Sequence, residues 1–506
     1  MNAVALPIEE LRFADVSAPS TPQRQTEVAA RLRAILPAHC VLFREEDTRP
    51  YECDGLSAFR QLPMVVVLPE TEAQVAQVLR VCNELQVPVV ARGAGTSLSG
   101  GAMPHASGVV LGLAKLNRIL SLDPVARIAR VQPGVRNLAI SEAAAPHGLY
   151  YAPDPSSQIA CTIGGNVAEN SGGVHCLKYG LTVHNVMRLR GYTIDGEAIE
   201  LGTEALDGAG LDLMALMIGS EGMLAIVTEV TVKLVPRPQV ARVVMASFDD
   251  VVRAGDAVAS IIAAGIIPAG LEMMDQKTAQ AVEPFVKAGY DLSAQAILLA
   301  ESDGTPEEVE EEIARIDEVL RGSGATAIRV SESEGERLRF WSGRKNAFPA
   351  AGRISPDYYC MDGTIPRKNL GRMLTAIADM ERQYDLRCMN VFHAGDGNLH
   401  PLILFDANDK AQWTRAELFG ADILELCVEL GGTVTGEHGV GIEKINSMCV
   451  QFSAAERAAF FAVKRAFDEP GLLNPGKGIP TTARCAEYGK MHVHGGRLPF
   501  ADLPRF

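Results

Sequence analysis

RGAGTSLSGG (residues 92–101) decides the fold, because this glycine- and hydroxyl-rich stretch directly follows VPVVAR (87–92), which predicts a buried strand. Glycine lets backbone N–H groups approach an anion closely, and Thr96 and Ser97 add side-chain donors. The pattern suits a pyrophosphate, although its spacing is neither that of a Rossmann fingerprint nor that of a P-loop. Taken alone, the stretch could also be a plain turn.

Two further stretches of similar composition follow. CTIGGNVAENSGGVHCLKYG (161–180), preceded by APDPSS (152–157), is a second loop rich in glycine and asparagine, and GSEGMLAIVTE (219–229) is a third. Three such loops in one region indicate an extended ligand that is held mainly by backbone groups. A dinucleotide fits that description better than a mononucleotide does.

Helices and strands alternate around these loops. Strands are predicted at 64–69, 87–92, 108–113, 126–134, 186–194 and 224–236, and helices at 22–36 and 71–86. Pro236 and Pro238 mark a candidate boundary. Beyond it, a second α+β region contains predicted helices at 306–322, 367–383 and 412–430 and another that begins at 453. The acidic run within 306–322 is predicted to be a solvated helix face.

Composition excludes several classes of protein. The chain has 506 residues, of which 47% are hydrophobic and 22% charged, as in a soluble globular protein of two to four domains. A net charge of −15 argues against a nucleic-acid partner. The ten cysteines include no C-x-x-C pair, which argues against a zinc ribbon, an iron–sulfur cluster and a disulfide framework. The sequence also shows no signal peptide and no membrane-spanning stretch, so we expect a cytoplasmic protein.

Two histidines flank a polar turn in VFHAGDGNLHP (391–401). If Gly395–Asn398 form a four-residue hairpin loop, His393 lies directly opposite His400. Directly paired side chains share a face of the sheet, so the two imidazoles could bind one divalent metal. An ordinary pair of hydrogen-bonded histidines explains the spacing equally well.

Two other stretches offer partners for these histidines. TGEHGVG (435–441) contains Glu437, which would complete a His₂Glu set with positions left open for a ligand, and His438 beside it. WSGRKNAF (341–348) contains Arg344, whose guanidinium could bind a carboxylate with two parallel hydrogen bonds. By itself, the basic pair in this stretch is better explained as a surface feature.

The combined motifs resemble a known flavoprotein family. RGAGTSLSGG, PDPSS, TIGGNVAENSGG, GSEGMLAIVTE and NPGK (474–477) resemble the FAD-binding loops of the vanillyl-alcohol-oxidase/PCMH superfamily. GRKNAF, HAGDGNLHP and GEHGVGIEK are similar to its FAD-linked 2-hydroxyacid dehydrogenase branch, which includes the FAD-binding subunits of bacterial glycolate oxidases and the FAD-linked D-lactate dehydrogenases. The resemblance spans roughly residues 40–506.

The resemblance implies an α+β fold with a PCMH-type two-part FAD-binding domain, an α+β substrate or cap domain, and a C-terminal segment that returns to the FAD domain. The parts expected along the chain are an N-terminal helical segment (1–58), the FAD-binding domain (59–237), the substrate domain with a metal site (238–440), the returning segment (441–480) and a surface tail (481–506).

The resemblance also implies which residues bind FAD. They are Arg92, Gly93, Ala94, Gly95, Thr96, Ser97, Gly100, Gly101, Pro153, Asp154, Thr162, Gly164, Gly165, Asn166, Asn170, Gly172, Gly173, Glu221, Gly222, Ile226 and Asn474. Some members attach FAD covalently through a histidine in the first loop. That loop contains no histidine here, so we expect non-covalent FAD; Cys161 could form a thioether link in principle, but a core thiol is the better interpretation.

In this family a metal on residues equivalent to His393, His400 and Glu437 binds the substrate hydroxyl and carboxylate, and the histidine equivalent to His438 is the base. We therefore expect a divalent metal, Zn²⁺ in particular. Arg344 is the expected substrate clamp, and Asn398 is expected to hydrogen-bond the substrate. Relatives that act on dicarboxylates carry a second basic residue a little downstream of Arg344. DYYCMDG (357–363) offers none, which favours a small monocarboxylate.

The function implied is oxidation of glycolate, or of D-lactate, by hydride transfer to flavin N5. The expected partners are a second flavoprotein-like subunit and an iron–sulfur subunit of a glycolate oxidase complex, peripheral to the inner face of the plasma membrane, or a respiratory quinone as acceptor. One alternative is a stand-alone FAD-linked D-lactate dehydrogenase. Another, of a different class, is a metal-dependent hydrolase whose glycine loops hold a nucleotide, but it does not explain three separate loops.

Overall fold

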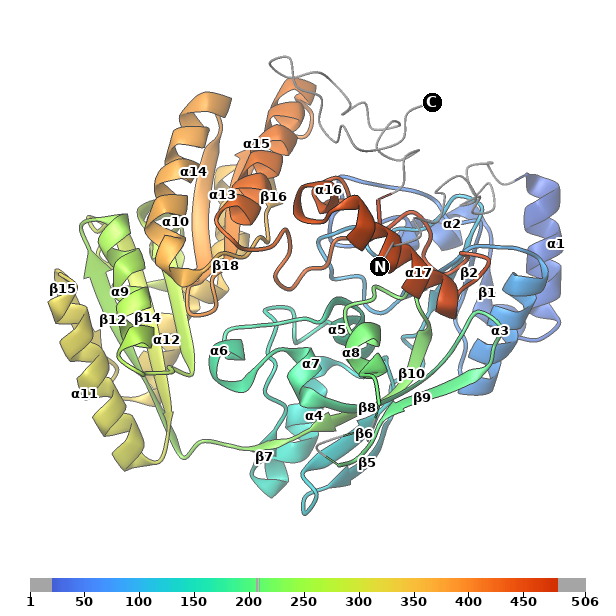
Figure 1. Ribbon diagram of the computed structural model, residues 1–506, viewed down its shortest axis with the longest axis horizontal. Coiled ribbons are helices and arrows are strands. Elements are labelled where there is room, and N and C mark those ends of the chain that lie inside the picture. Colours follow the sequence, from blue (N-terminus) through green and yellow to red (C-terminus); the bar gives the residue numbers. More distant parts are fainter. Residues whose placement is uncertain (1–20, 206–207, 209, 481–506) are drawn as a thin grey trace, which may run out of the picture.

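The structure is a computed structural model that describes residues 21–205, 208 and 210–480. The first 20 residues of the predicted N-terminal segment and the predicted tail therefore lie outside the described residues. The described chain forms two lobes, one with the elements from α1 to β11 and the other with those from β12 to α15 (Figure 1). None of the helices in this part of the chain has the length and hydropathy of a membrane span.

The lobe with the three glycine loops is built on two main sheets. The first has the order β1-β2-β4-β3, from Val41–Leu42, Val65–Val67, Val109–Gly112 and Val89–Arg92, and β2 and β3 run parallel to β4. The second is antiparallel with the order β5-β6-β10-β8-β9, from Ile119–Asp123, Ile128–Val131, Ile226–Lys233, Val186–Tyr192 and Ala198–Gly202. All the strands predicted in this region are confirmed.

Short helices connect these strands. They are α1 (Pro22–Arg33), α2 (Glu45–Thr48), α3 (Glu72–Glu84), α4 (Asn137–Ala144), α5 (Ile163–Glu169), α6 (Cys176–Tyr179), α7 (Thr182–Asn185) and α8 (Leu213–Met217). Thr71 caps α3, in a capping box with Gln74. The expectation that 161–180 is one loop is wrong, because α5 and α6 lie within it. The Thr162 side chain accepts a hydrogen bond from Gly165 N and starts α5 despite the two glycines in its first turn.

The other lobe is one antiparallel sheet of seven strands. Its order is β15-β12-β14-β13-β17-β18-β16, from Ala327–Val330, Val240–Phe248, Ala296–Gly304, Gly270–Asp275, Arg387–His393, Asn398–Phe405 and Asp357–Cys360. Both faces of the sheet are covered. On β12, for example, Val244 and Ala246 belong to one core cluster, whereas Val243 and Met245 belong to another. This alternation is what the two-residue period of a strand requires.

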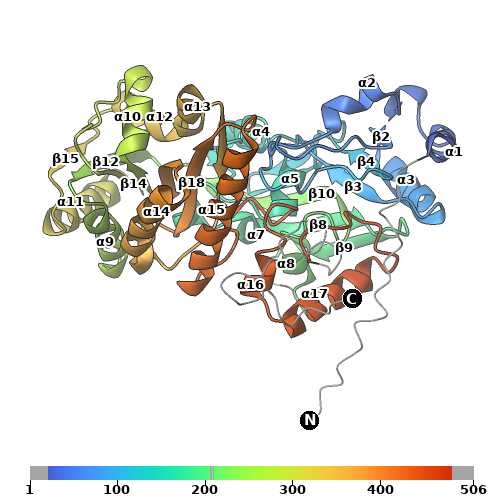
Figure 2. The same ribbon diagram turned by 90° about the horizontal axis from the view of Figure 1, so that it is seen from above.

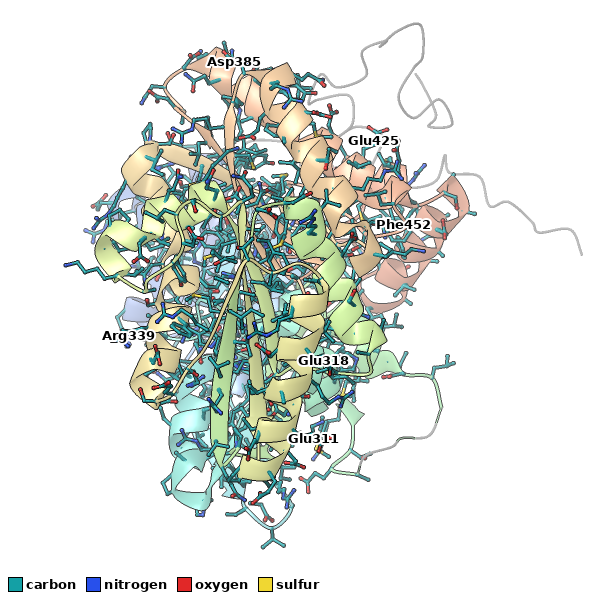
Figure 3. All side chains as sticks on the ribbon, turned by 90° about the vertical axis from the view of Figure 1, so that its left-hand side faces the viewer. Glu311, Glu318, Arg339, Asp385, Glu425 and Phe452 are labelled. Carbon is teal, nitrogen blue, oxygen red and sulfur yellow. The ribbon has the colours of Figure 1, made fainter. Side chains whose placement is uncertain are left out.

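Helices cover each face of this sheet (Figures 1 and 2). One face carries α9 (Val251–Ala263), α11 (Pro306–Gly322), α14 (Leu370–Tyr384) and α15 (Lys410–Glu429), and the other carries α10 (Gln276–Val286), α12 (Glu334–Lys345) and α13 (Ala347–Ile354). Helix α11 buries Val309, Ile313, Ile316 and Leu320, at the spacing of one helix face. Its acidic side chains, among them Glu311 and Glu318 in Figure 3, lie on the opposite face, so the predicted solvated face is confirmed.

The chain leaves the first lobe through β11 (Val235–Pro236), which pairs with β7 (Leu149–Tyr150), and it returns at its C-terminal end. Helix α17 (Ala454–Phe467) packs against the first lobe through Val463 and Phe467, whereas the short α16 (Met448–Gln451) contacts α15 and joins the core of the second lobe through Met448 (Figure 1). After α17 the chain runs parallel to β3, where Val89 N donates to Leu472 O and Asn474 N donates to Val89 O, both at 2.8 Å. The returning segment is thus confirmed, while the exact domain boundaries stay predictions.

Asn474 fastens this segment to two of the glycine loops. Its Nδ2 donates to Gly101 O at 2.9 Å and to Glu221 O at 2.7 Å, and the side chain is buried. Its backbone is in the left-handed region, with φ of 42°. A single amide therefore joins the first loop, the third loop and the C-terminal segment.

We predict that Asn474→Gly destabilises the protein, because two buried carbonyls lose their donor at a cost of about 1–3 kcal/mol each. Glycine adopts a positive φ without strain, so the backbone itself loses nothing. Asp385→Gly is the matched control, because Asp385 also has a positive φ, of 49°, at the end of α14 (Figure 3). Urea unfolding should show a lower midpoint for Asn474→Gly only; equal midpoints for the two variants would contradict the assignment.

Candidate active site

A cavity of about 420 Å³ lies where the two lobes meet. The first lobe contributes its glycine loops to the wall, and the second contributes Lys345, Phe348, His400, Glu437 and His438. Residues that are far apart in the sequence thus line one space. The predicted cofactor loops meet three of the predicted catalytic and metal-binding residues there, His400, Glu437 and His438.

Most of the residues predicted to bind FAD lie on this wall. They are Arg92, Gly93, Ala94, Gly95, Thr96, Ser97, Gly101, Thr162, Gly164, Gly165, Asn166, Glu221 and Gly222. The wall offers backbone groups of glycine-rich loops for a phosphate and apolar side chains, such as Leu98, Leu113 and Pro133, for a ring system. This combination fits FAD chemically.

Other residues predicted to bind FAD do not line the cavity. They are Gly100, Pro153, Asp154, Asn170, Gly172, Gly173, Ile226 and Asn474, and their role at the cofactor stays a prediction. Asp154 is turned away because its carboxylate binds His175 Nδ1 at 2.7 Å and His175 N at 3.1 Å. The next residues of the PDPSS stretch, Pro155, Ser156 and Ser157, line the cavity instead.

The predicted register of the histidine hairpin is wrong by one residue on each strand. The loop is 394–397, so His393 pairs with Asn398 and His400 pairs with Val391. The turn closes early because Gly397 takes a φ of 82° and donates its N–H to His393 O at 3.0 Å. Since a slip of one residue on both strands leaves the faces unchanged, the two histidines still share a face as diagonal neighbours, with ring centroids 5.0 Å apart.

Both imidazoles point their Nε2 atoms at one carboxylate oxygen. Glu437 Oε1 lies 3.3 Å from His393 Nε2 and 3.1 Å from His400 Nε2. On the far side of each ring, Nδ1 faces an acceptor, Glu272 Oε1 at 2.6 Å for His393 and Met361 O at 3.4 Å for His400. Acceptors at Nδ1 leave the Nε2 lone pairs for a metal, as is usual for histidine ligands. The donor set fits a divalent cation.

Two other groups of possible ligands are less suitable. Cys360 lies near His400 and His438, but burial raises the pKa of its thiol well above the usual value, so the thiolate form is disfavoured. His39, Cys40 and Glu70 lie outside the cavity, where the Lys115 ammonium is 2.8 Å from Glu70 and 3.4 Å from Cys40 Sγ and would repel a cation.

His438 lies between the histidine pair and the glycine loops. Its ring stacks on that of His400, with centroids 5.0 Å apart and planes 7° apart. Burial lowers the pKa of His438 to about 4, although Asp362 opposes this shift, so the imidazole is neutral at pH 7. Its Nδ1 is buried without a hydrogen-bond partner in the described part of the chain. A neutral ring with an unused nitrogen is what a proton acceptor requires.

Sequence reasoning missed Asp362, whose carboxylate binds residues 435–438 on both sides of Glu437. This fully buried carboxylate accepts hydrogen bonds from Thr435 Oγ1 at 2.6 Å, from Asn398 Nδ2 at 2.9 Å and from Lys444 Nζ at 3.1 Å. It also accepts the three consecutive backbone N–H groups of residues 436–438. An acidic residue at the end of the apolar run YYCM was the available signal.

Arg344 and Asn398, the predicted substrate contacts, are both buried and already bonded. Arg344 Nε donates to Glu272 Oε2 at 2.5 Å, and its Nη2 lies 3.5 Å from both ring nitrogens of His393. Asn398 Nδ2 donates to Asp362. Neither residue lines the cavity, whereas Lys345 does. Their predicted roles are not tested by this geometry.

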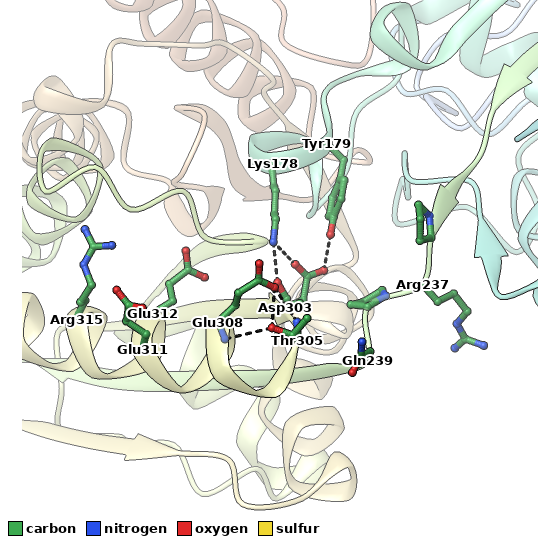
Figure 4. A pocket seen from close by; sticks show the side chains of 13 residues that line it. Lys178, Tyr179, Arg237, Gln239, Asp303, Thr305, Glu308, Glu311, Glu312 and Arg315 are labelled. Carbon is green, nitrogen blue, oxygen red and sulfur yellow. Dashed lines mark hydrogen bonds and ion pairs between the residues drawn. The ribbon is translucent and has the colours of Figure 1, made fainter.

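A second cavity of about 490 Å³ lies at the junction of the lobes, beside β11 and α11. Figure 4 shows Lys178 and Tyr179 pointing at Asp303, with bonds to its carboxylate. The wall carries charges of both signs and shares no residue with the predicted site. The bonds to Asp303 at its wall join the two lobes.

Comparisons with known proteins agree with this architecture. The model of the family "FAD binding domain" matches residues 63–202, and the model of "FAD linked oxidases, C-terminal domain" matches residues 237–478. The solved structure of p-cresol methylhydroxylase with substrate bound has a TM-score of 0.78 at 17% identity, over 90% of this chain and 97% of that one. This likeness establishes the PCMH-type fold that was predicted.

Comparison by sequence finds relatives with a much higher identity to this chain than that structure has. The glycolate oxidase subunit GlcD of Escherichia coli (strain K12) is 62% identical over 482 residues, which is 95% of this chain and 97% of that protein. GlcD of Bacillus subtilis (strain 168) is 40% identical over 86% of this chain and 93% of that protein, and a D-lactate dehydrogenase of Anaerostipes hadrus is 31% identical over 89% and 97%. The chain therefore belongs to the FAD-linked oxidases and is an FAD-dependent oxidoreductase of that family.

Proposed function

We propose that this chain oxidises a small 2-hydroxy monocarboxylate, glycolate in the first place and D-lactate as the alternative, to the 2-oxoacid. The observation that carries the proposal is that His438, His400 and Glu437 line one cavity with the flavin loops, and that His393 meets His400 at the Glu437 carboxylate. The similarity to GlcD supports glycolate, and the similarity to D-lactate dehydrogenase supports the alternative.

His393, His400 and Glu437 would hold a divalent metal, Zn²⁺ in our proposal, through two Nε2 atoms and a carboxylate oxygen. The metal would supply a Lewis acid that lowers the pKa of the substrate hydroxyl. Glu272 and the Met361 carbonyl fix the orientation of the two rings through their Nδ1 atoms. Three protein ligands would leave positions open to the substrate oxygens.

His438 would accept the hydroxyl proton, since its imidazole is neutral and one ring nitrogen is unused. FAD would supply the hydride acceptor. The cap lobe would limit the access of water, because Phe348 and Pro349 add apolar surface to the cavity wall.

The substrate carboxylate requires a cation, for which we propose Arg344. Its Nε is bound to Glu272, whereas its Nη2 lies over His393 next to the proposed metal ligands. Lys345 lies on the cavity wall and is a second candidate. With no further basic residue in 357–363, the site suits one carboxylate rather than two.

We propose that the electrons leave to partners. The E. coli and B. subtilis relatives are named as subunits of glycolate oxidase, which supports an assembly. Its other members would be the second flavoprotein-like subunit and the iron–sulfur subunit that the family resemblance implies. Such an assembly could lie at the inner face of the plasma membrane and pass electrons to a quinone.

The first test is anaerobic bleaching of the flavin band near 450 nm. We expect glycolate to bleach it faster than D-lactate at equal concentration, and the ratio of kcat/KM gives the preference. A faster rate with D-lactate would favour the stand-alone dehydrogenase. No bleaching with either acid, in protein that contains FAD, would overturn the proposed function.

His400→Ala tests the proposed metal set. Removing this ligand should lower bound zinc and slow flavin reduction by about 100-fold or more, because several kcal/mol of Lewis-acid stabilisation are lost. FAD content should not change. His39→Ala is the matched control, because His39 also pairs with a glutamate, Glu70 at 3.2 Å, but lies outside the cavity. Loss of FAD in His400→Ala would show that the histidine is structural.

Arg344→Lys and Lys345→Ala distinguish the two candidate clamps. Arg344→Lys should raise the KM for glycolate about tenfold or more, because a lysine cannot replace the planar guanidinium. Lys345→Ala should change KM less than threefold if Lys345 makes only a solvent-screened contact. The reverse order in steady-state kinetics would assign the carboxylate to Lys345.

A further inference from the structure

Glu272 is a buried carboxylate between two residues of the proposed site. It lies on β13, which pairs with β17 in antiparallel register, Met273 opposite Phe392 and Met274 opposite Val391. Extended by one residue, this register places Glu272 opposite His393. Directly opposed residues bring their side chains within contact, which accounts for the 2.6 Å between Glu272 Oε1 and His393 Nδ1. The strand register therefore dictates this contact.

The second oxygen of the same carboxylate binds the proposed substrate clamp. Glu272 Oε2 accepts the Nε–H of Arg344, and all three side chains are buried. A guanidinium keeps its charge in a protein, so Arg344 balances Glu272. The carboxylate can then accept the Nδ1–H of His393, which turns Nε2 toward Glu437 Oε1 at 3.3 Å.

We propose that Glu272 is a positioning residue that couples the two halves of substrate binding, because one carboxylate fixes the ring of a metal ligand and the guanidinium of the carboxylate clamp. This inference rests on the proposed function. Since the two oxygens act on different partners, loss of the carboxylate should weaken metal binding and substrate binding together. It should leave FAD binding unchanged, because Glu272 does not line the cavity.

The chain offers a matched control on the neighbouring strand. Glu301 on β14 is likewise a buried glutamate between a histidine and an arginine, with Oε1 3.2 Å from His175 Nε2 and Oε2 2.7 Å from Arg337 Nη1. None of these three residues lines the candidate cavity. Glu272→Gln and Glu301→Gln therefore make the same chemical change in the same kind of cluster.

The experiment compares these variants as FAD-loaded full chains. The dissociation constant for Zn²⁺ is measured by competition with a chromophoric chelator, and the KM for glycolate by steady-state kinetics. Glu272→Gln should raise the zinc constant about 10- to 100-fold, as loss of an outer-shell partner does, and should raise KM as well. Glu301→Gln should change both less than twofold.

Glu272→Asp provides a second variant if the glutamine variant does not fold. It keeps the charge beside Arg344 but retracts from His393 Nδ1, so it should raise the zinc constant by a smaller factor, with flavin content unchanged.

Wild-type zinc affinity in both the Glu272→Gln and the Glu272→Asp proteins, or equal losses in Glu272→Gln and Glu301→Gln, would overturn the inference alone. A wild-type chain that binds no zinc would overturn it together with the proposed metal site.

Discussion

The carboxylate of Asp362 is the constraint on which the geometry of the candidate site depends. It is fully buried, and burial alone would raise its pKa, but His438, Lys444 and His400 hold the pKa far below its usual value. The ionised group attracts N–H and O–H donors, and the three consecutive backbone N–H groups of 436–438 wrap around it as an anion nest. This wrapping directs the side chains of Glu437 and His438 toward the hairpin.

The same constraint explains why the site forms only where the lobes meet. Asp362 and the hairpin belong to the seven-stranded lobe, but the loop at 435–441 also accepts hydrogen bonds from the first lobe and donates them to it. Glu221 accepts Val440 N and Gly441 N at 2.7 Å each, and Ser97 Oγ donates to His438 O at 3.2 Å. A carboxylate from each lobe thus holds one segment, which sets the proposed base against the flavin loops.

The sequence predicted the fold class, most strands and helices and many of the residues that line the cavity, because these depend on local patterns. The hairpin shows the limit. Alternation along the strands placed His393 and His400 on one face of the sheet. This prediction is right although the predicted pairing was wrong, because a shift of one residue on both strands does not change the face on which a side chain lies. The turn lies one residue earlier than predicted, where Gly397 takes a positive φ and Asn398 is held by Asp362, a residue 36 positions away.

Glu272 and Asp362 escaped prediction for the same reason. Each is an acidic residue in or just after a mostly apolar strand, in GLEMMD and DYYCMDG, and nothing nearby in the chain indicates its partner. Their roles come from sheet register and from the return of the chain after α15, which periodicity cannot reveal. Glycine-rich loops can be recognised from a short stretch of sequence, whereas carboxylates that orient distant residues cannot.

Charge balance adds an argument for a cation among the histidines. Three carboxylates hold them: Glu272, Asp362 and Glu437. Arg344 balances Glu272, and Lys444 balances Asp362. In the part of the chain that the structure describes, the ion-pair partners of Glu437 are histidines only. A buried carboxylate without a fixed cation is costly. The charge that Glu437 requires must therefore come from a proton on an imidazole or from a metal, and the two compete for the same Nε2 atoms.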